Sequence, residues 1–145
     1  MTLLSWSNQY LIGEPTIDKE HHELFDLINA FHTHWQEDRK RSEIANILSK
    51  LVKYAELHFQ HEEAIMATAG YPLLDEHRAV HEKLFLSIFQ LNEGYMNNLR
   101  GIEMDTMKFV RDWLIQHIIN NDYLFRDFLV RKKQADAQGT NAKPD

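Results

Sequence analysis

A run of evenly spaced side chains between residues 44 and 69 constrains the fold more than any other feature of this sequence. The run alternates steps of four and three residues without a gap, through Ile44, Leu48, Leu51, Ala55, His58, Glu62, Ile65 and Ala69. Such a heptad stripe predicts a long helix that packs one face against other helices. Gly70, Tyr71 and Pro72 follow the stripe, and they predict a helix end and a turn.

Three further segments have helical periodicity: residues 18–37, where Asp18 is a suitable N-cap, residues 74–95, and residues 105–130. The chain contains only five glycines and three prolines, and no segment alternates with a period of two for long enough to suggest a strand. We therefore expect an all-α protein, an up-down-up-down antiparallel bundle of four helices.

The two ends of the chain differ from the periodic segments. Residues 1–17 carry spaced apolar side chains, among them Trp6, Tyr10 and Ile12, so we expect an N-terminal arm packed across the bundle. Residues 132–145 are polar and lack apolar periodicity, which predicts a flexible tail after a single domain over residues 1–131.

Composition excludes several classes of function. The chain has 145 residues, a net charge of −6 and no cysteine. The absence of cysteine excludes thiolate zinc sites, iron–sulfur clusters and cysteine nucleophiles. The acidic balance argues against nucleic acid as a partner. No apolar run is long enough to span a membrane, and the N-terminus lacks a signal peptide pattern, so together with the absence of cysteine we expect a cytoplasmic protein. We also expect a monomer.

Polar side chains interrupt two of the apolar stripes. His58 and Glu62 lie in the second stripe, and His77 and His81 lie in the third. Each would cost about 2–7 kcal/mol if it were buried without a partner. Both pairs have i, i+4 spacing, which puts the two side chains on one helix face, one turn apart. This spacing predicts that each helix supplies two ligands to a metal.

The first and last helices add further candidates. His21 opens the inward stripe of the first helix, and His117 lies on that of the fourth, which also includes Asn121, Leu124 and Phe128. Asp122 is five residues after His117, about 140° around an α-helix. Either its carboxylate reaches sideways or the helix widens into a π-type turn. We favour the sideways reach.

The donor set narrows the choice of metal. Five imidazoles and two carboxylates are too many for one ion and about right for two ions that share bridging ligands. Nitrogen and oxygen donors without sulfur suit iron, manganese or zinc, and they disfavour calcium, magnesium and copper(I). The paired Glu-x-x-His motifs of carboxylate-rich di-iron bundles are absent from the inward stripes.

Four segments together resemble the hemerythrin family, and within it the single-domain bacteriohemerythrins. They are residues 17–21, 58–63, 70–81 and 113–122, and the resemblance extends over residues 6–128. It implies a non-haem di-iron centre that binds dioxygen reversibly, with an oxo or hydroxo bridge between the two irons.

The resemblance also implies a role for each candidate ligand. His77, His81 and His117 would bind one iron, whereas His21 and His58 would bind the other. Glu62 and Asp122 would bridge the two ions. Three histidines and three bridges make six donors, whereas two histidines and three bridges make five. The second iron would therefore keep one open position for dioxygen.

The same comparison implies an apolar oxygen pocket made of Leu24, Phe59, Trp113, Leu114 and Ile118. Two positions depart from the usual family pattern: Glu20 replaces a common glutamine, and Phe125 replaces a common tyrosine, with Tyr123 nearby. Four further histidines lie off the inward stripes and are expected at the surface: His22, His32, His34 and His61.

The leading hypothesis is a dioxygen-binding protein, not an enzyme, that stores or transports oxygen or delivers it to oxygen-requiring enzymes. An oxygen-consuming enzyme or a reductase is a conceivable partner. The alternatives are a di-iron enzyme that reduces peroxide or nitric oxide, a sensor of oxygen or iron, and a metal store or a site filled by zinc or manganese.

Overall fold

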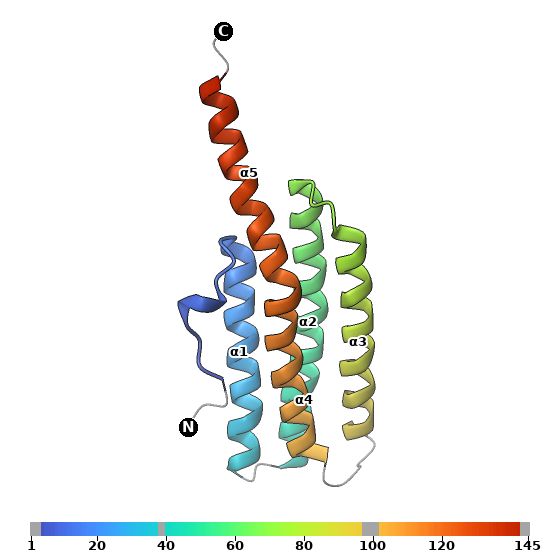
Figure 1. Cartoon of the computed structure of the whole chain (residues 1–145). Coiled ribbons are helices and arrows are strands. Elements are labelled where there is room, and N and C mark those ends of the chain that lie inside the picture. Colours follow the sequence, from blue (N-terminus) through green and yellow to red (C-terminus); the bar gives the residue numbers. More distant parts are fainter. Residues whose placement is uncertain (1–3, 38–39, 97–101, 143–145) are drawn as a thin grey trace.

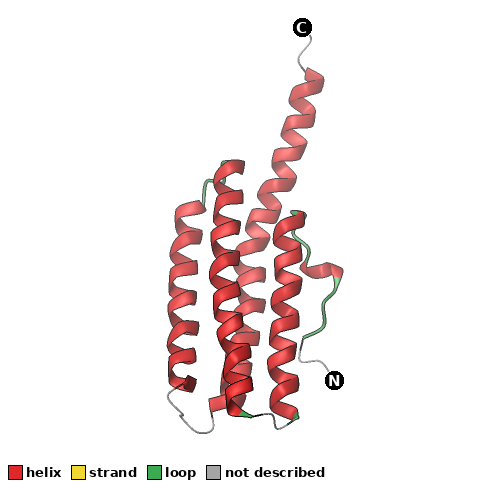
Figure 2. Cartoon of the chain, turned by 180° about the vertical axis from the view of Figure 1, so that it is seen from behind, coloured by secondary structure: helices red, strands yellow, loops and turns green. Residues whose placement is uncertain are grey.

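Antiparallel helices run the length of the molecule (Figure 1). The computed structural model describes residues 4–37, 40–96 and 102–142. The helical segments are α1 (Pro15–Gln36), α2 (Arg41–Ala69), α3 (Leu74–Met96), α4 (Ile102–His117), the π-helical turn η2 (Ile118–Asp122) and α5 (Tyr123–Ala142). The last three follow one another without a break, so α4, η2 and α5 form one long fourth helix. The described residues contain no strand (Figure 2), and the predicted all-α bundle is confirmed.

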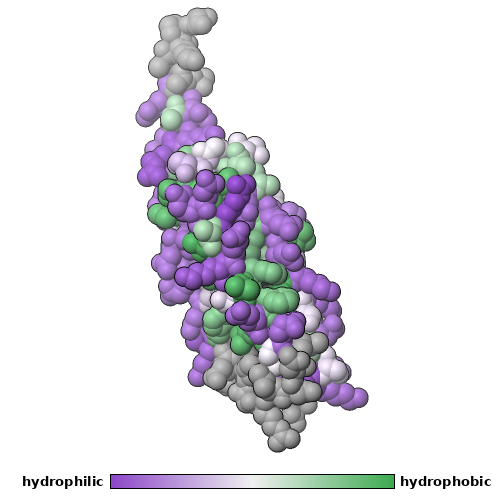
Figure 3. Space-filling model, turned by 90° about the vertical axis from the view of Figure 1, so that its right-hand side faces the viewer, coloured by the Kyte–Doolittle hydropathy of each residue, from purple (hydrophilic) through white to green (hydrophobic). Residues whose placement is uncertain are grey.

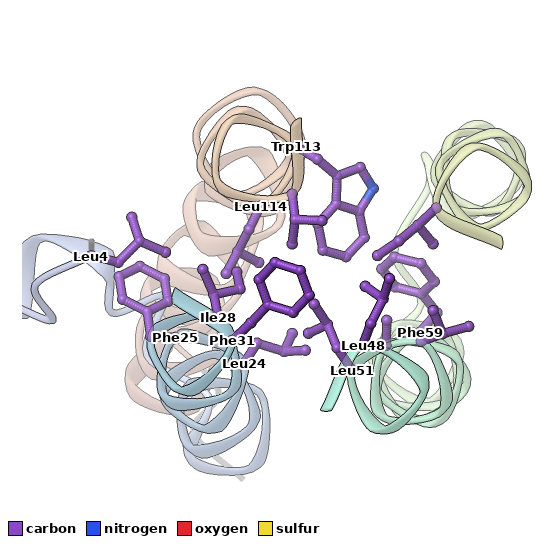
Figure 4. Close-up of a cluster of buried hydrophobic side chains, with 14 of the residues drawn as sticks. Leu4, Leu24, Phe25, Ile28, Phe31, Leu48, Leu51, Phe59, Trp113 and Leu114 are labelled. Atoms are coloured by element: carbon purple, nitrogen blue, oxygen red, sulfur yellow. The ribbon is translucent and has the colours of Figure 1, made fainter. Parts of the chain in front are cut away.

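Neighbouring helices in the bundle pack along their apolar stripes. α1 and α3 each lie against both α2 and α4. Their inward side chains form a large core whose members come from the arm, α1, α2, α3 and the fourth helix, and Figure 4 shows part of it. The residues at its centre are almost fully buried: Leu24, Ile28, Phe31, Leu48, Leu51 and Leu114. The periodicity that predicted the helices therefore also identified much of the core.

The first helix begins three residues earlier than predicted. Pro15 occupies its first position, where a missing N–H costs nothing, and the Glu14 carboxylate accepts the Ile17 N–H at 2.8 Å. Asp18 is therefore not the N-cap. Its side chain instead accepts the N–H of Ile12 at 2.8 Å, which fixes the arm to the first turn of α1.

The end of α2 is a left-handed cap. Gly70 has φ of 72°, a conformation that costs L-residues with a side chain about 1–2 kcal/mol. Its N–H points back to the carbonyl of Ala67, and the Tyr71 N–H donates to Met66 O at 3.0 Å. The predicted turn at this point is confirmed.

The arm is held at both ends of its described part. Leu4 exchanges two hydrogen bonds with the Asn29 side chain of α1, at 2.9 and 2.8 Å. Further along the arm, the short helix η1 (Asn8–Tyr10) lies near α5, where the Tyr123 hydroxyl donates to Gln9 O at 2.5 Å. The predicted packing of an arm against the bundle is thus present.

The C-terminal segment differs from its prediction. The helix was expected to end at about Val130, but α5 continues to Ala142 and projects beyond the end of α2 (Figure 1). Residues 132–142 have no apolar stripe, yet several are good helix formers. The Lys132 ammonium also donates to Ala69 O at 2.7 Å, which satisfies a carbonyl at the α2 C-terminus. No helix in the described ranges is long and apolar enough to cross a membrane.

Candidate metal centre

The seven candidate ligands come from all four helices of the bundle and meet in its middle. α1 supplies one, α2 two, α3 two, and the fourth segment two, one of them from η2. All are buried, with exposed fractions between 0% and 4%: His21, His58, Glu62, His77, His81, His117 and Asp122. Neighbouring helices thus place a cluster of ionisable groups where an apolar core would otherwise lie.

Glu62 lies at the centre of this cluster, and its two oxygens face different groups of histidines. Oε1 lies 2.6 Å from Nε2 of His77, 3.1 Å from Nε2 of His81 and 3.6 Å from Nε2 of His117. Donor atoms of these four residues lie within 4.8 Å of one another. One carboxylate oxygen and three imidazole nitrogens therefore surround one point.

The other oxygen of Glu62 faces the remaining two histidines. Oε2 lies 3.2 Å from Nε2 of His58 and 3.6 Å from Nε2 of His21. These three residues form a second group whose donor atoms also lie within 4.8 Å of one another. The two groups share Glu62, which is the arrangement of a bridging carboxylate.

Asp122 divides its oxygens between the same two groups. Oδ1 lies 3.3 Å from Nε2 of both His77 and His117, and Oδ2 lies 3.0 Å from Nε2 of His21. The second carboxylate is therefore also oriented as a bridge. Geometry alone thus separates the five histidines into a set of three and a set of two.

The π-turn η2 brings Asp122 into this position. The Tyr123 N–H bonds to Ile118 O, five residues back, where an α-helix would use the fourth. Asp122 then shares a face with His117, and Asn121, the residue that a regular helix would turn inward, is only half-buried. The preferred sideways reach of the carboxylate is wrong, because the backbone itself rotates Asp122 inward.

The cluster as it stands leaves buried polar atoms without hydrogen bonds. Five buried atoms of the described residues lie close to other members of the cluster but form no hydrogen bond of suitable geometry: Nε2 of His21 and His58, Oε2 of Glu62 and both oxygens of Asp122. Each such atom costs about 1–3 kcal/mol. Nε2 of His81 and Nε2 of His117 lie 3.1 Å apart, close to the roughly 3.0 Å between two nitrogens that bind one ion at right angles. These observations fit residues arranged to hold metal.

The carboxylates strongly affect the histidines. Burial alone lowers an imidazole pKa, but close contacts with the negatively charged carboxylates of Asp122 and Glu62 outweigh it and raise the pKa of His21 to about 9. The same carboxylates raise the pKa of His117 to about 10. Burial dominates at His81 and lowers its pKa. Despite burial, the surrounding histidines hold the pKa of Asp122 and Glu62 below the usual range, so both carboxylates are ionised.

Comparison with known proteins assigns the chain to a family. The family described as the hemerythrin HHE cation binding domain matches residues 13–129. The chain belongs to the hemerythrin family. The bacteriohemerythrin of Methylococcus capsulatus is 32% identical over 126 residues, which cover 86% of this chain and 95% of that protein. The bacteriohemerythrin of Stenotrophomonas maltophilia is 31% identical, and the match covers 88% of this chain and 82% of that protein.

Solved hemerythrin structures agree with the fold. The crystal structure of a wild-type hemerythrin is 31% identical in sequence and has a TM-score of 0.77. The match covers 86% of this chain and 96% of the hemerythrin chain. The crystal structure of a hemerythrin L114Y mutant has a TM-score of 0.80 at the same identity. Membership of the hemerythrin family implies a non-haem iron site, and the buried histidine and carboxylate cluster supplies suitable donors for it.

Beyond the seven candidate ligands, Glu20 forms a link that the sequence did not reveal. Nδ1 of His58 donates to one oxygen of Glu20 at 2.9 Å, and Nδ1 of His61 donates to the other at 2.5 Å. A proton on Nδ1 leaves the Nε2 lone pair of His58 free and directed at Glu62. His61 is about half exposed, as expected, but it was not expected to contact a site residue.

A second carboxylate supports the other group of histidines. Nδ1 of His81 donates to Glu63 at 2.8 Å, and Arg78 lies 3.4 Å from the other oxygen of that carboxylate. One histidine in each group therefore donates a hydrogen bond from Nδ1, the ring nitrogen that faces away from Glu62, to a carboxylate outside the cluster. The only sequence signals for these contacts were the doubled acid at residues 62–63 and the acid directly before His21.

The predicted oxygen-pocket residues lie in the same apolar core beside the cluster. Leu24, Phe59, Trp113, Leu114 and Ile118 are all at most 5% exposed. The Phe59 ring stacks on His81 with centroids 4.0 Å apart and contacts Trp113 edge-on. Figure 4 shows how α1, α2 and α4 contribute to this wall.

The remaining histidines lie apart from the cluster. His22 is exposed and its ring stacks on Trp6, with centroids 4.9 Å apart. His32 and His34 are half-buried, although the sequence predicted both at the surface. Nδ1 of His34 donates to Ala30 O at 2.9 Å, a local bond within α1. None of these three belongs to either group of donors among the described residues.

Proposed function

We propose that this chain binds dioxygen reversibly at a non-haem di-iron centre and serves in oxygen storage, transport or delivery, without turnover. The observation that carries this proposal is the division of Glu62 between two groups of histidines, three on one oxygen and two on the other. Asp122 repeats the division. A symmetric set would suit two equally filled ions, whereas an unequal set leaves one ion a donor short.

The ligand assignment follows from this division. His77, His81 and His117 would hold one iron, His21 and His58 would hold the other, and Glu62 and Asp122 would bridge them. With a solvent-derived bridge, the first ion would have six donors and the second would have five. When bound, the two ferrous ions supply the electrons that dioxygen takes up.

The surrounding residues suit reversible binding. The five apolar side chains beside the cluster exclude water, which protects a bound reactive species from hydrolysis and proton leakage. The chain also has no cysteine to act as a redox partner. These features favour a carrier over an enzyme that reduces peroxide or nitric oxide, which would need a steady supply of electrons and protons.

The test is reconstitution with ferrous iron without oxygen, followed by metal analysis and optical spectra. We expect two irons per chain and an absorption band that forms with dioxygen and disappears under vacuum over repeated cycles. Irreversible bleaching in the first cycle would contradict oxygen carriage and favour the enzymatic alternative.

A matched pair of variants tests the bridge. Glu62→Ala should bind fewer than two irons per chain, because both groups of histidines lose their shared oxygens. Glu56→Ala changes an exposed acid on the same helix and should retain two. Circular dichroism checks that both variants are folded. A folded Glu62→Ala protein with two irons would remove Glu62 as a bridge.

A further inference from the structure

A cavity of about 490 Å³ lies between α3 and α4, on the outer side of the metal cluster. Its size falls within the range of small-molecule sites. Val80, Leu84 and Phe109 give it apolar walls, and Trp113 and His117 form part of its lining. Figure 3 looks onto the α3 side of the molecule and shows apolar patches set among polar side chains. Of the candidate ligands, this lining includes His117 alone.

Trp113 gives the cavity an unsatisfied hydrogen-bond donor. The side chain is only 5% exposed, and its indole N–H has no partner among the described residues. Figure 4 shows the indole nitrogen on the side of the ring that faces α3, away from the core. Leaving such a group unpaired costs about 1–3 kcal/mol. The nitrogen itself is closed to solvent, and an acceptor atom that reached it from the cavity would recover this energy.

His117 offers a second donor of the same kind. Its Nε2 faces Asp122 at 3.3 Å, whereas its Nδ1 is buried and has no partner in the described part of the chain. With Nε2 on a metal, the ring proton lies on Nδ1, so this atom can only donate. This second donor rests on the proposed metal centre, but the donor of Trp113 does not.

The polar residues of the cavity favour a negatively charged acceptor. Lys83 belongs to the lining and carries a positive charge, and Gln116 adds an amide. The one acidic group in the lining, Asp112, is largely exposed and lies 3.0 Å from the guanidinium of Arg111, which offsets its charge. The balance of charge and donors therefore suits an anion.

We propose that this cavity binds a small organic carboxylate with an apolar tail. The carboxylate accepts the indole N–H of Trp113 and is attracted by Lys83, while the tail packs against Val80 and Leu84. A carboxylate supplies the acceptor that the buried donors lack, and a short aliphatic tail covers the apolar walls.

Isothermal titration calorimetry on the metal-loaded protein tests the proposal, with hexanoate as the probe and hexanamide as its neutral match. We expect hexanoate to bind with a dissociation constant in the millimolar range or tighter. Lys83→Gln should weaken hexanoate about fivefold, the effect of one partly exposed charge, and leave hexanamide unchanged. Equal weakening of both probes would contradict the charge preference.

Two variants locate the binding site. Leu84→Trp fills the cavity and should abolish binding of both probes; if it does not fold, Val80→Phe serves the same purpose. Trp113→Phe keeps an aromatic ring but removes the N–H, and it should weaken both probes roughly tenfold. Hexanoate binding that survives a folded cavity-filling variant would place the probe elsewhere, for example on the metal, and would overturn the proposal.

The outcomes separate this proposal from the proposed function. A protein that binds oxygen reversibly but not hexanoate has the metal centre and lacks the second site. A protein that binds hexanoate but takes up no iron retains the cavity, with Trp113 as its donor.

Discussion

Glu20 shows how a single side chain can support a site that it does not enter. Its carboxylate accepts N–H groups from both His58 and His61, so both oxygens are occupied. Burial raises the pKa of Glu20, but hydrogen bonds from the two histidines outweigh it, and the net shift is downward. An ionised carboxylate at this position makes the imidazole of His58 more basic and therefore a stronger ligand for a metal.

Replacement of Glu20 should weaken metal binding in a graded way. Glu20→Ala removes both hydrogen bonds and should lower metal affinity about 10–100-fold, the usual effect of losing such a partner. Glu20→Gln should cost less, because its amide oxygen can still accept from His58. Competition with a chelator measures both affinities, and Asp26→Asn, an exposed change on the same helix, is the control. An affinity unchanged in Glu20→Ala would show that His58 needs no partner.

At the scale of one element, the turn η2 shifts the inward face of the fourth helix by one position. Downstream of the turn, Phe125 is fully buried, whereas Leu124 is 48% exposed. The regular stripe predicted the opposite for Leu124. One extra residue in the turn therefore sets both the position of Asp122 and the packing of α5.

An exchange of two neighbouring residues tests the turn. In the double variant Asn121→Asp, Asp122→Asn, a regular helix would carry the new carboxylate inward, whereas η2 keeps position 122 inside. We expect metal content to fall as far as in Asp122→Asn alone. Two irons per chain in the double variant would mean that the helix is regular at this point in solution.

The cap of α2 permits a stability prediction at the same scale. Gly70 has a positive φ, and a Cβ at this position would meet no other atom within 4 Å. Gly70→Ala should therefore lower the free energy of unfolding by about 1–2 kcal/mol through backbone strain alone. Gly70→Asn should cost less, since asparagine tolerates this conformation. Urea denaturation measures both, and equal losses would point to a steric cause.

At the scale of the whole molecule, the buried carboxylates make stability depend on pH. In the metal-free protein, the positive charges of protonated His21 and His117 balance the negative charges of Glu62 and Asp122. The pKa of His21 is raised from 6.5 to about 9, and that of His117 is raised to about 10. A histidine whose pKa is higher in the folded state than in the unfolded state stabilises the fold at any pH below its unfolded-state pKa. This stabilisation is lost as the pH rises through the folded-state pKa.

The stability of the metal-free protein should therefore fall between about pH 6.5 and 10, by an amount on the order of a few kcal/mol. The metal-loaded protein should behave differently, because ligand imidazoles must be neutral and acid displaces the metal. Urea denaturation at several pH values, with and without metal, measures the difference. A metal-free protein that becomes more stable toward pH 10 would contradict the charge balance.

Periodicity predicted what depends on local pattern. The stripes gave the four helices, and the i, i+4 pairs in α2 and α3 marked four of the buried donors before any geometry was known. What escaped prediction depends on contacts between distant segments. The bond between Glu20 and His61 joins two helices, and neither residue lies on an inward stripe.

Backbone irregularities were equally hidden. A π-turn and a regular α-turn can have similar sequences, so the position of Asp122 left both explanations open, and the less economical one is present. The extension of α5 was missed because an apolar stripe is not needed where Lys132 holds the helix to the end of α2.

The two groups of histidines are coupled, because Glu62 and Asp122 contact both of them. An ion bound by one group would fix the orientation of both carboxylates and so complete the other group. We therefore expect cooperative loading: at low iron supply, the population should divide into empty and doubly filled molecules, with few that carry a single ion.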